Sequence, residues 1–210
     1  MIELFGNTAS RANRVQWALE ELEVPYDFYQ IDFAEGDSQS EFFLKLNPAG
    51  KVPVLRDGDL VITESAAICN YLGEKYPEKG LVPNSGTPER AHYDQWLFFV
   101  LTELEQPLWT AGKHKFAIPE AYRVPAIFPT THWEFKRAAR LLSQGLGEKP
   151  FILGDRFSMA DIFITHTLIW AELFKFSIDH PHLPEYLARL RTRPALKRIK
   201  EKPKLTIPRS

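Results

Sequence analysis

Glu64 and Ser65 combine an acid and a hydroxyl at the point where an amphipathic stretch predicts the start of a helix. The first amides of a helix have no partner within the helix, and together with a hydroxyl they form a ready site for a carboxylate. The pair therefore favours binding of a carboxylate-bearing ligand. An ordinary helix cap with an acid nearby is the alternative.

A proline stands inside a stretch that otherwise predicts a buried strand. Pro53 interrupts the apolar residues Val52, Val54 and Leu55, and a proline donates no hydrogen bond to a sheet ladder. If the peptide bond before Pro53 is cis, the chain bends sharply and exposes the backbone N–H and C=O of Val52. An extended peptide can then pair with these groups like an added strand. A trans proline on an edge strand is the alternative.

The turn before the first predicted helix carries three hydrogen-bond donors, the amide of Asn7 and the hydroxyls of Thr8 and Ser10. A thiol with a pKa of about 8.5 is a weak nucleophile at neutral pH until its thiolate is stabilised. A hydroxyl at a helix start does this, because it donates to the anion where the helix dipole also favours negative charge. Ser10 is equally suited to be a simple N-cap.

The remaining reactive side chains predict neither a redox site nor a metal site. Cys69 is the only cysteine and lies inside a predicted helix, so we expect it to pack in the core. The six histidines show no spacing of the H-E-x-x-H kind, and we expect no metal.

Composition narrows the classes of function. The 210 residues include 44% hydrophobic and 13% aromatic residues, enough for one large core or two smaller ones. The net charge of −1 argues against nucleic acid as a partner. The first residues lack the pattern of a secretory signal, and no run of about 18 apolar residues occurs. We therefore expect a cytoplasmic protein that does not enter a membrane.

Charge is unevenly distributed along the chain. Residues 1–80 hold 7 Lys/Arg against 14 Asp/Glu, and residues 81–210 hold 19 against 13. The sign changes in a stretch rich in Pro, Gly, Asn and Ser, which is typical of a linker. We predict domains at 1–79 and 88–202 with a linker at 80–87, their opposite charges suiting them to face each other in an assembly. The basic residues from Arg189 onward, broken by prolines, are expected to be solvated and partly frayed.

Strand and helix patterns alternate in the first domain. Short strands are predicted at 2–6 and 25–32, and apolar residues recur at helical spacing between them. A short helix, a β-hairpin containing Pro53 and a helix starting at Glu64 follow. This order of parallel and antiparallel elements predicts a thioredoxin-like α/β domain.

The second domain is predicted to be an all-α helical bundle. A long amphipathic helix begins near residue 88, and another covers about 121–146, with irregular first turns at Pro125 and Pro129. The stretch after Ser158 is apolar nearly all round, so it predicts the central helix of the bundle. Ser158 and Asp161 form an S-x-x-D pattern, a variant of the capping box.

The motifs "NPAGKVPVL", "ESAAI" and "SMADI" follow one another on these two domains, and with them the chain resembles the cytosolic glutathione transferases over nearly its whole length. The resemblance implies a glutathione site in the first domain, a site for a hydrophobic electrophile between the domains, and a homodimer. It also favours the cis form of the Val52–Pro53 bond.

The resemblance assigns a part of glutathione to each residue of the first site. Val52 and Pro53 hold the cysteinyl residue. Ser65 and its amide hold the γ-glutamyl carboxylate, while Glu64 holds the ammonium group by a charge-assisted bond. Lys51 stands within reach of the glycyl carboxylate, although a solvated lysine is the alternative.

Serine-type members of the family place their active serine four residues before an arginine, and Ser10 precedes Arg14 by four. Ser10 is therefore the expected partner of the thiolate. This sequence departs from the family pattern because no proline lies between the two, so Thr8 and Asn7 stay as alternatives.

The stretch 104–125 is the part least like the family, and the resemblance implies that it overhangs the electrophile site. The candidates to line that site are Trp109, His114, Phe116 and Tyr122. An aromatic cluster after the kink expected at Pro107 is equally compatible with plain core packing.

Three functions remain compatible with these residues. The first is a glutathione S-transferase of the serine type that joins the glutathione thiolate to a hydrophobic electrophile. The second keeps glutathione as co-substrate but reduces disulfides or peroxides, with Asn7 or Thr8 as the thiolate partner. The third is a non-catalytic binding module, which the intact residues of the first site argue against. The sequence does not identify the electrophile.

Overall fold

The computed structural model describes residues 1–208 and divides the chain into two compact units. Unit 1 comprises Met1–Val82 together with the segment from Arg193 on, and unit 2 comprises Pro83–Thr192. The predicted second domain at 88–202 differs in its last ten residues, which belong to unit 1. These residues form a helix with its own partners in unit 1, a long-range pairing that a reading along the chain misses.

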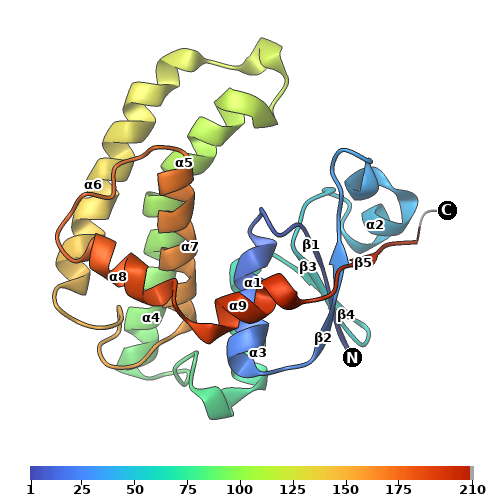
Figure 1. The fold of residues 1–210 in the computed structure, drawn as a ribbon, viewed down its shortest axis with the longest axis horizontal. Coiled ribbons are helices and arrows are strands. Elements are labelled where there is room, and N and C mark those ends of the chain that lie inside the picture. Colours follow the sequence, from blue (N-terminus) through green and yellow to red (C-terminus); the bar gives the residue numbers. More distant parts are fainter. Residues whose placement is uncertain (209–210) are drawn as a thin grey trace. The chain divides into compact units, whose positions relative to one another are not determined.

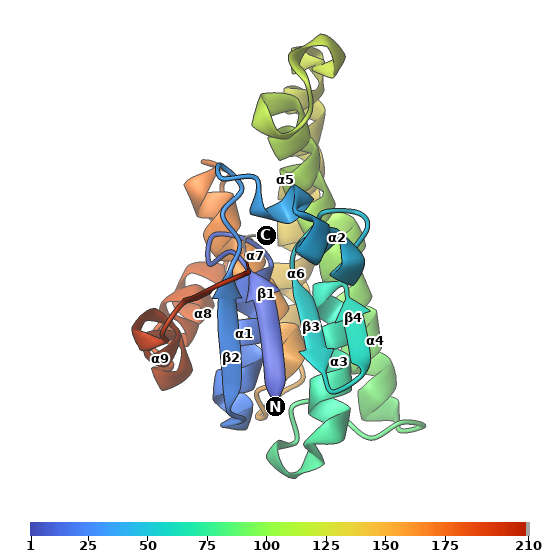
Figure 2. The same cartoon turned by 90° about the vertical axis from the view of Figure 1, so that its right-hand side faces the viewer.

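A five-stranded sheet forms the centre of unit 1. Its strand order is β4-β3-β1-β2-β5, with β2 parallel to β1 and β3 antiparallel to it (Figure 2). The strands are β1 (Ile2–Gly6), β2 (Tyr26–Gln30), β3 (Val54–Asp57), β4 (Leu60–Thr63) and β5 (Leu205–Thr206). The helices are α1 (Ala12–Leu22), α2 (Glu41–Leu46), α3 (Ser65–Lys75) and α9 (Pro194–Glu201). The predicted thioredoxin-like fold is confirmed.

Residues 193–208, called the strap from here on, run along one side of unit 1. Helix α9 lies against α1, and β5 pairs with the edge strand β2 (Figure 1). Ile207 is only 3% exposed and belongs to the apolar cluster of unit 1. The expectation of a frayed end is therefore wrong for the strap, because ion pairs and one buried side chain outweigh its polar composition. Residues 209–210 lie outside the described residues.

Because the strap belongs to unit 1, the difference in net charge that the sequence suggested between the two domains disappears. With residues 193–210 included, unit 1 holds 14 Lys/Arg and 15 Asp/Glu, and unit 2 holds 12 of each. The acidic first domain is thus neutralised within its own unit. Opposite net charges do not distinguish the two units as the sequence suggested.

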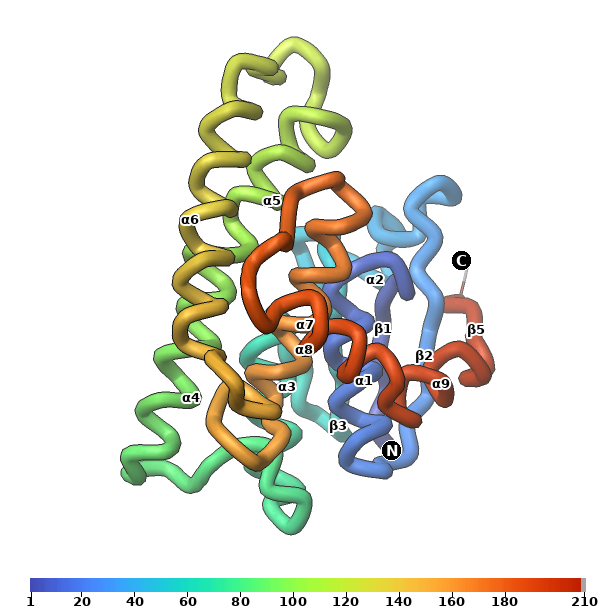
Figure 3. The backbone as a smooth tube through the Cα atoms, turned by 60° about the vertical axis from the view of Figure 1, so that its left-hand side comes forward, coloured from blue at the N-terminus to red at the C-terminus, as the bar shows by residue number. Residues whose placement is uncertain are grey.

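Unit 2 is a helical bundle, as predicted. Its α-helices are α4 (Pro88–Phe99), α5 (Glu105–Gly112), α6 (Phe128–Leu146), α7 (Met159–Leu173) and α8 (Leu183–Leu190). Two π-helical turns, Val100–Leu104 and Lys113–Ala117, continue the line of α4 and α5. Helix α6 runs beside α5 (Figure 3) and begins at 128 rather than 121, because Pro125 and Pro129 confine the residues before it to short turns. Among the described residues, no helix combines the length and apolarity that a membrane span requires.

Asp161 organises the start of α7. Its buried carboxylate accepts hydrogen bonds from the backbone N–H of Ile152 (2.8 Å) and of Ser158 (2.9 Å), and from two hydroxyls, Ser158 Oγ (3.0 Å) and Tyr186 Oη (2.7 Å). The predicted capping box is confirmed. Complete burial raises the pKa of Asp161, and these four donors oppose that effect.

Candidate functional site

The register of the sheet brings three of the predicted site segments to one end of unit 1. Val54 pairs with Thr63 of β4 and with Phe5 of β1. If each register is extended past its last pair, the residues before Val54 come level with the residues that follow Thr63 and Phe5. Segments 51–53, 64–65 and 7–10 therefore converge, although they are far apart in sequence. They form the candidate site.

The peptide bond between Val52 and Pro53 is cis, which confirms the prediction. The ladder pairs of β3 begin at Val54, so the peptide groups of Val52 and Pro53 lie outside them. Val52 itself is half-buried and packs against the apolar cluster of unit 1. Beside it, the Lys51 carbonyl accepts a hydrogen bond from Asn47 Nδ2 (2.7 Å), while the Lys51 side chain is exposed. The main-chain groups of Val52 and Pro53 thus lie outside the ladder, next to the apolar cluster of unit 1.

Glu64 and Ser65 occupy the start of α3 in an unusual backbone conformation. Glu64 has φ 65° and ψ 113°. Residues other than glycine rarely adopt this backbone conformation, which costs about 1–3 kcal/mol. Its carbonyl accepts the first helical bond from Ile68 N–H (2.9 Å), and its side chain is exposed. Ser65 is buried, and within residues 1–208 its hydroxyl forms no hydrogen bond. Unpartnered amides and a hydroxyl at a helix start suit a carboxylate.

The turn between β1 and α1 is held by its own hydrogen bonds. Ser10 Oγ donates to the Asn7 carbonyl (2.6 Å) and accepts from the Ala12 N–H (3.1 Å). The Asn7 side chain donates to the Ile31 carbonyl (3.1 Å) and accepts from the Ala9 N–H (2.9 Å). In the part of the chain that the structure describes, the half-buried Thr8 hydroxyl has no such partner. The three donors named from sequence thus differ in how freely each can turn to a ligand.

Gly6 allows this turn to come close to β1. A Cβ atom at this position would lie 2.3 Å from Ala12 Cβ, far inside van der Waals contact. Only a residue without a side chain lets α1 begin this near the end of the strand. The start of α1 is therefore fixed next to the candidate site.

Cys69 takes no part in the site chemistry. It is completely buried in α3, with Sγ 3.9 Å from the Arg14 carbonyl, and burial raises the pKa of its thiol to about 12. At neutral pH the thiol stays protonated and unreactive. The predicted packing role is confirmed.

Two of the four residues expected to line an electrophile site belong to one aromatic cluster in unit 2. The ring centroid of Trp109 lies 6.5 Å from that of Trp170, and Phe116 lies 6.1 Å from Phe174. Trp170 and Phe174, 5.6 Å apart, join the two pairs. Sequence reasoning missed these two linking residues because α7, which contains Trp170 and ends just before Phe174, is apolar nearly all round and shows no distinct face.

The other two residues of that prediction have different surroundings. His114 Nδ1 accepts a hydrogen bond from the Val124 N–H (3.0 Å), so it fixes the loop that follows α5. Tyr122 is 72% exposed, and no ring contact of Tyr122 is described within residues 1–208. Gly112 completes the cluster instead, since a Cβ there would touch Phe174, Trp109 and Phe116 at 3.4–3.7 Å.

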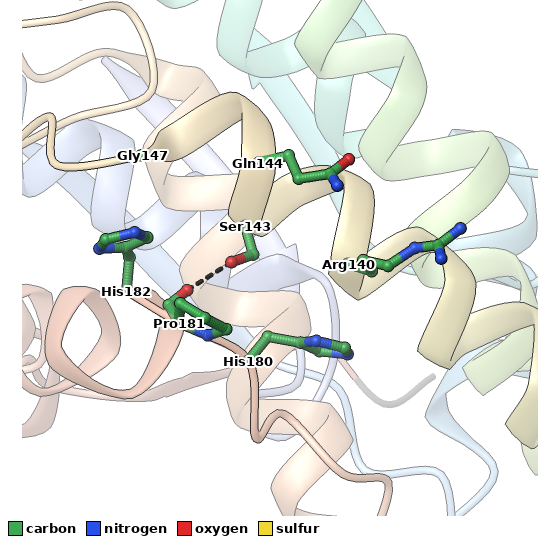
Figure 4. A pocket seen from close by; sticks show the side chains of 7 residues that line it. All are labelled: Arg140, Ser143, Gln144, Gly147, His180, Pro181 and His182. Carbon is green, nitrogen blue, oxygen red and sulfur yellow. Dashed lines mark hydrogen bonds between the residues drawn. The ribbon is translucent and has the colours of Figure 1, made fainter.

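A surface hollow of about 460 Å³ elsewhere in unit 2 does not have the arrangement of a binding or catalytic site. Ser143 Oγ donates to the Pro181 carbonyl across its middle, which occupies the hydroxyl (Figure 4). Arg140 and His180 extend to one side of this bond, and His182 extends to the other. The ends of these side chains do not converge on a common point. Among residues 1–208, no group of three His, Cys, Asp or Glu side chains is placed to hold a metal.

Comparisons with known proteins identify the family. Residues 1–74 match the glutathione S-transferase N-terminal domain, and residues 134–197 match the C-terminal domain. Glutathione S-transferase GstB of Escherichia coli K12 is 30% identical over 205 residues, covering 95% of this chain and 97% of GstB.

Two solved structures agree in fold over almost the whole chain. A glutathione transferase from Methylococcus capsulatus superposes with a TM-score of 0.84 at 28% identity, covering 96% of this chain and 98% of its own. Glutathione transferase URE2P6 from Phanerochaete chrysosporium, solved in complex with oxidized glutathione, gives 0.81 at 26% identity, covering 95% and 94%. The chain described here therefore belongs to the cytosolic glutathione S-transferase family.

Proposed function

We propose that this protein is a serine-type glutathione S-transferase that joins the thiolate of glutathione to a hydrophobic electrophile. The observation that carries the proposal is the convergence of Val52, Ser65 and the turn at 7–10 at one end of the sheet. The complex of the relative URE2P6 with oxidized glutathione supports glutathione as the ligand class.

Glutathione has groups that complement each segment of the site. Its cysteinyl backbone pairs with the N–H and C=O of Val52 beside the cis Pro53. Its γ-glutamyl carboxylate takes the Ser65 hydroxyl and the first amides of α3, and its ammonium group lies against the Glu64 carboxylate. The exposed Lys51 ammonium is available for the glycyl carboxylate. Every charge of the tripeptide then has a partner of opposite charge or a hydrogen-bond donor.

Ser10 is the proposed donor to the sulfur. In the structure its proton is directed at the Asn7 carbonyl, so binding of the thiolate exchanges that bond for one to an anion. A hydrogen bond between neutral groups contributes about 0.5–1.5 kcal/mol, and one to a charged group about 1.5–3 kcal/mol. The exchange is therefore favourable, and the thiolate gains more than the thiol. The pKa of the bound thiol falls as a result.

Thr8 is the second candidate, because its hydroxyl can donate without giving up a bond within residues 1–208. Asn7 is the weakest of the three, since both ends of its amide already hold the turn. Thr8 as thiolate partner would also suit the reduction of disulfides or peroxides.

The aromatic cluster of unit 2 is the proposed contact surface for the electrophile. Trp109 and Phe116 contribute as predicted, and Trp170 and Phe174 extend the surface. We assign His114 to loop support and keep Tyr122 as an exposed rim residue. Rings of this kind bind flat apolar molecules by stacking and burial.

The Ser65→Ala variant tests the glutathione site. We expect glutathione binding to weaken by about 1.5–3 kcal/mol, because the carboxylate loses a hydrogen bond that the Ser65 hydroxyl donates. Calorimetric titration of wild type and variant measures this loss. The matched control is Thr63→Val, which removes a hydroxyl two residues earlier, before α3 starts. Equal affinities of Ser65→Ala and wild type would refute the assignment of Ser65.

A panel of substrates tests the reaction. Wild-type protein retained on immobilised glutathione is assayed with aromatic and alkyl electrophiles, mixed disulfides and peroxides. Turnover of electrophiles supports the proposal, and turnover of disulfides or peroxides alone supports the reductase. Retention without any turnover would identify a binding module.

We also propose a homodimer, the assembly that the family resemblance implies. Within each unit the numbers of positive and negative side chains are nearly equal, so each unit has a net charge near zero. Long-range charge attraction therefore has little part in orienting the subunits. Light scattering at micromolar concentration is expected to give a dimer at both low and high salt. A monomer at low salt would refute the proposed dimer. A dimer at low salt that dissociates at high salt would show that charge attraction holds the subunits together.

A further inference from the structure

The strap is attached to unit 1 by charged side chains at regular intervals. Arg193 forms two hydrogen bonds with the carboxylate of Glu21 (2.6 and 2.7 Å), and Arg198 Nε lies 2.9 Å from a carboxylate oxygen of Glu20. The Lys202 ammonium lies 4.0 Å from the ring centroid of Tyr26. These contacts hold α9 along α1 and deliver the following residues to the edge of the sheet.

The register of β5 then determines where Ile207 lies. Thr206 pairs with Gln30 of β2, and Gln30 pairs in turn with Gly6 of β1, all in parallel. Residues following Thr206 and residues following Gly6 therefore occupy the same end of the sheet. Ile207 arrives at the end that carries the candidate site, although the strap comes last in the described chain.

The apolar cluster of unit 1 links Ile207 to the site by two routes. It belongs to one buried cluster with Phe5 and Val54, and the half-buried Val52 packs against this cluster. The cluster also contains Ile31, whose carbonyl accepts the hydrogen bond from the Asn7 side chain. One route leads to the main chain that would pair with glutathione. The other leads to the turn that would carry the donor to the sulfur.

We infer that Ile207 is a positioning residue for the glutathione site, acting through Val52 and Ile31 rather than by contact with the ligand. The inference rests on the proposed function. A gap in place of the Ile207 side chain lets Val52 and the turn at 7–10 move, and small displacements of groups that hold a reactant are costly. The strap thereby makes the geometry of the site depend on a segment that contributes no ligand contact.

The test compares Ile207→Ala with Leu205→Ala, a control that shortens a 39% exposed side chain on the same strap. Steady-state kinetics are measured with an electrophile turned over by wild type. For Ile207→Ala we expect the KM for glutathione to rise about tenfold and kcat to fall as well, because both the main chain that pairs with the peptide and the turn that carries the sulfur donor are displaced. Leu205→Ala should keep the wild-type KM, and Ile207→Val should recover most of it.

Hydrogen exchange supplies a second measurement that needs no catalysis. In Ile207→Ala, amides in the peptide 47–56 should exchange faster, while a peptide from α7 in unit 2 exchanges as in wild type. If Ile207→Ala fails to fold, Ile207→Val is compared with wild type and should show the same changes at reduced size.

Three outcomes overturn the inference. An unchanged KM together with unchanged exchange at 47–56 removes the role of Ile207. An equal effect in Leu205→Ala shows that attachment of the strap matters and the buried side chain does not. Faster exchange throughout unit 1 shows general loosening. Failure of wild type to bind glutathione overturns the proposed function itself, and the exchange data still decide whether Ile207 holds the segment.

Discussion

Replacing Ser10 with alanine is expected to raise the pKa of the thiol of bound glutathione by about one to two pH units. The thiolate loses a charge-assisted hydrogen bond, whereas the neutral thiol loses little. At neutral pH the thiolate fraction would fall by roughly ten- to a hundredfold, and the conjugation rate would fall with it. Binding of glutathione should change much less, because Val52, Glu64 and Ser65 still hold the peptide. The ultraviolet absorbance of the thiolate, titrated against pH, measures the shift directly.

Thr8→Val is the matched variant, since it removes the other hydroxyl of the turn and keeps the shape of the side chain. Ser10→Ala also removes the hydroxyl that donates to the Asn7 carbonyl and accepts from the Ala12 N–H, so a structural effect has to be separated from a catalytic one. Urea unfolding of both variants does this. If the thiolate titration curve of Ser10→Ala coincides with that of wild type and the titration curve of Thr8→Val shifts, Thr8 is the donor. If neither shifts, no hydroxyl of this turn activates the thiol.

Replacing Asp161 with alanine is expected to lower the free energy of unfolding by about 3–5 kcal/mol, a large part of the stability of an ordinary domain. The change leaves the buried donors on Ile152, Ser158 and Tyr186 without an acceptor, and each such group costs about 1–3 kcal/mol. Equilibrium unfolding in urea, followed by circular dichroism, measures the loss.

Tyr186→Phe is the graded control for this prediction. It removes one of the four donors and leaves the carboxylate with its other bonds, so we expect a loss of about 1 kcal/mol. If Asp161→Ala lowers the free energy of unfolding by less than the loss expected for Tyr186→Phe, the hydrogen-bond network at the start of α7 contributes little to stability. Retained affinity for glutathione in whatever Asp161→Ala protein folds would confirm that Asp161 has a role in folding rather than in binding.

The parts of the fold that follow from short stretches of sequence could be predicted. A turn at 57–59 between two apolar runs determines the β3–β4 hairpin, and the hairpin register alone brings Val52 to the level of Ser65. The N-cap pattern of Ser158 and Asp161 likewise depends on four consecutive residues. Local spacing was sufficient in both cases.

The parts that depend on pairing between distant segments could not be predicted. Strand β5 has only two residues, both exposed, and Leu205 and Ile207 stand among prolines and lysines. No periodicity marks so short an element. The alternative donors in the turn at 7–10 differ only in hydrogen bonds, such as that from Ser10 to the Asn7 carbonyl, which sequence spacing does not reveal.

The parallel pairing of β2 with β5 has a consequence for the order in which the chain is completed. Tyr29 and Leu205 are partners in the sheet, and the whole of unit 2 lies between them in sequence. During synthesis the first four strands can assemble early, but the edge of β2 stays open until residue 206 has been made. An open strand edge is a template for pairing with another chain. Unit 1, which begins first, is therefore closed last, and the helical unit is synthesised while that edge is still exposed.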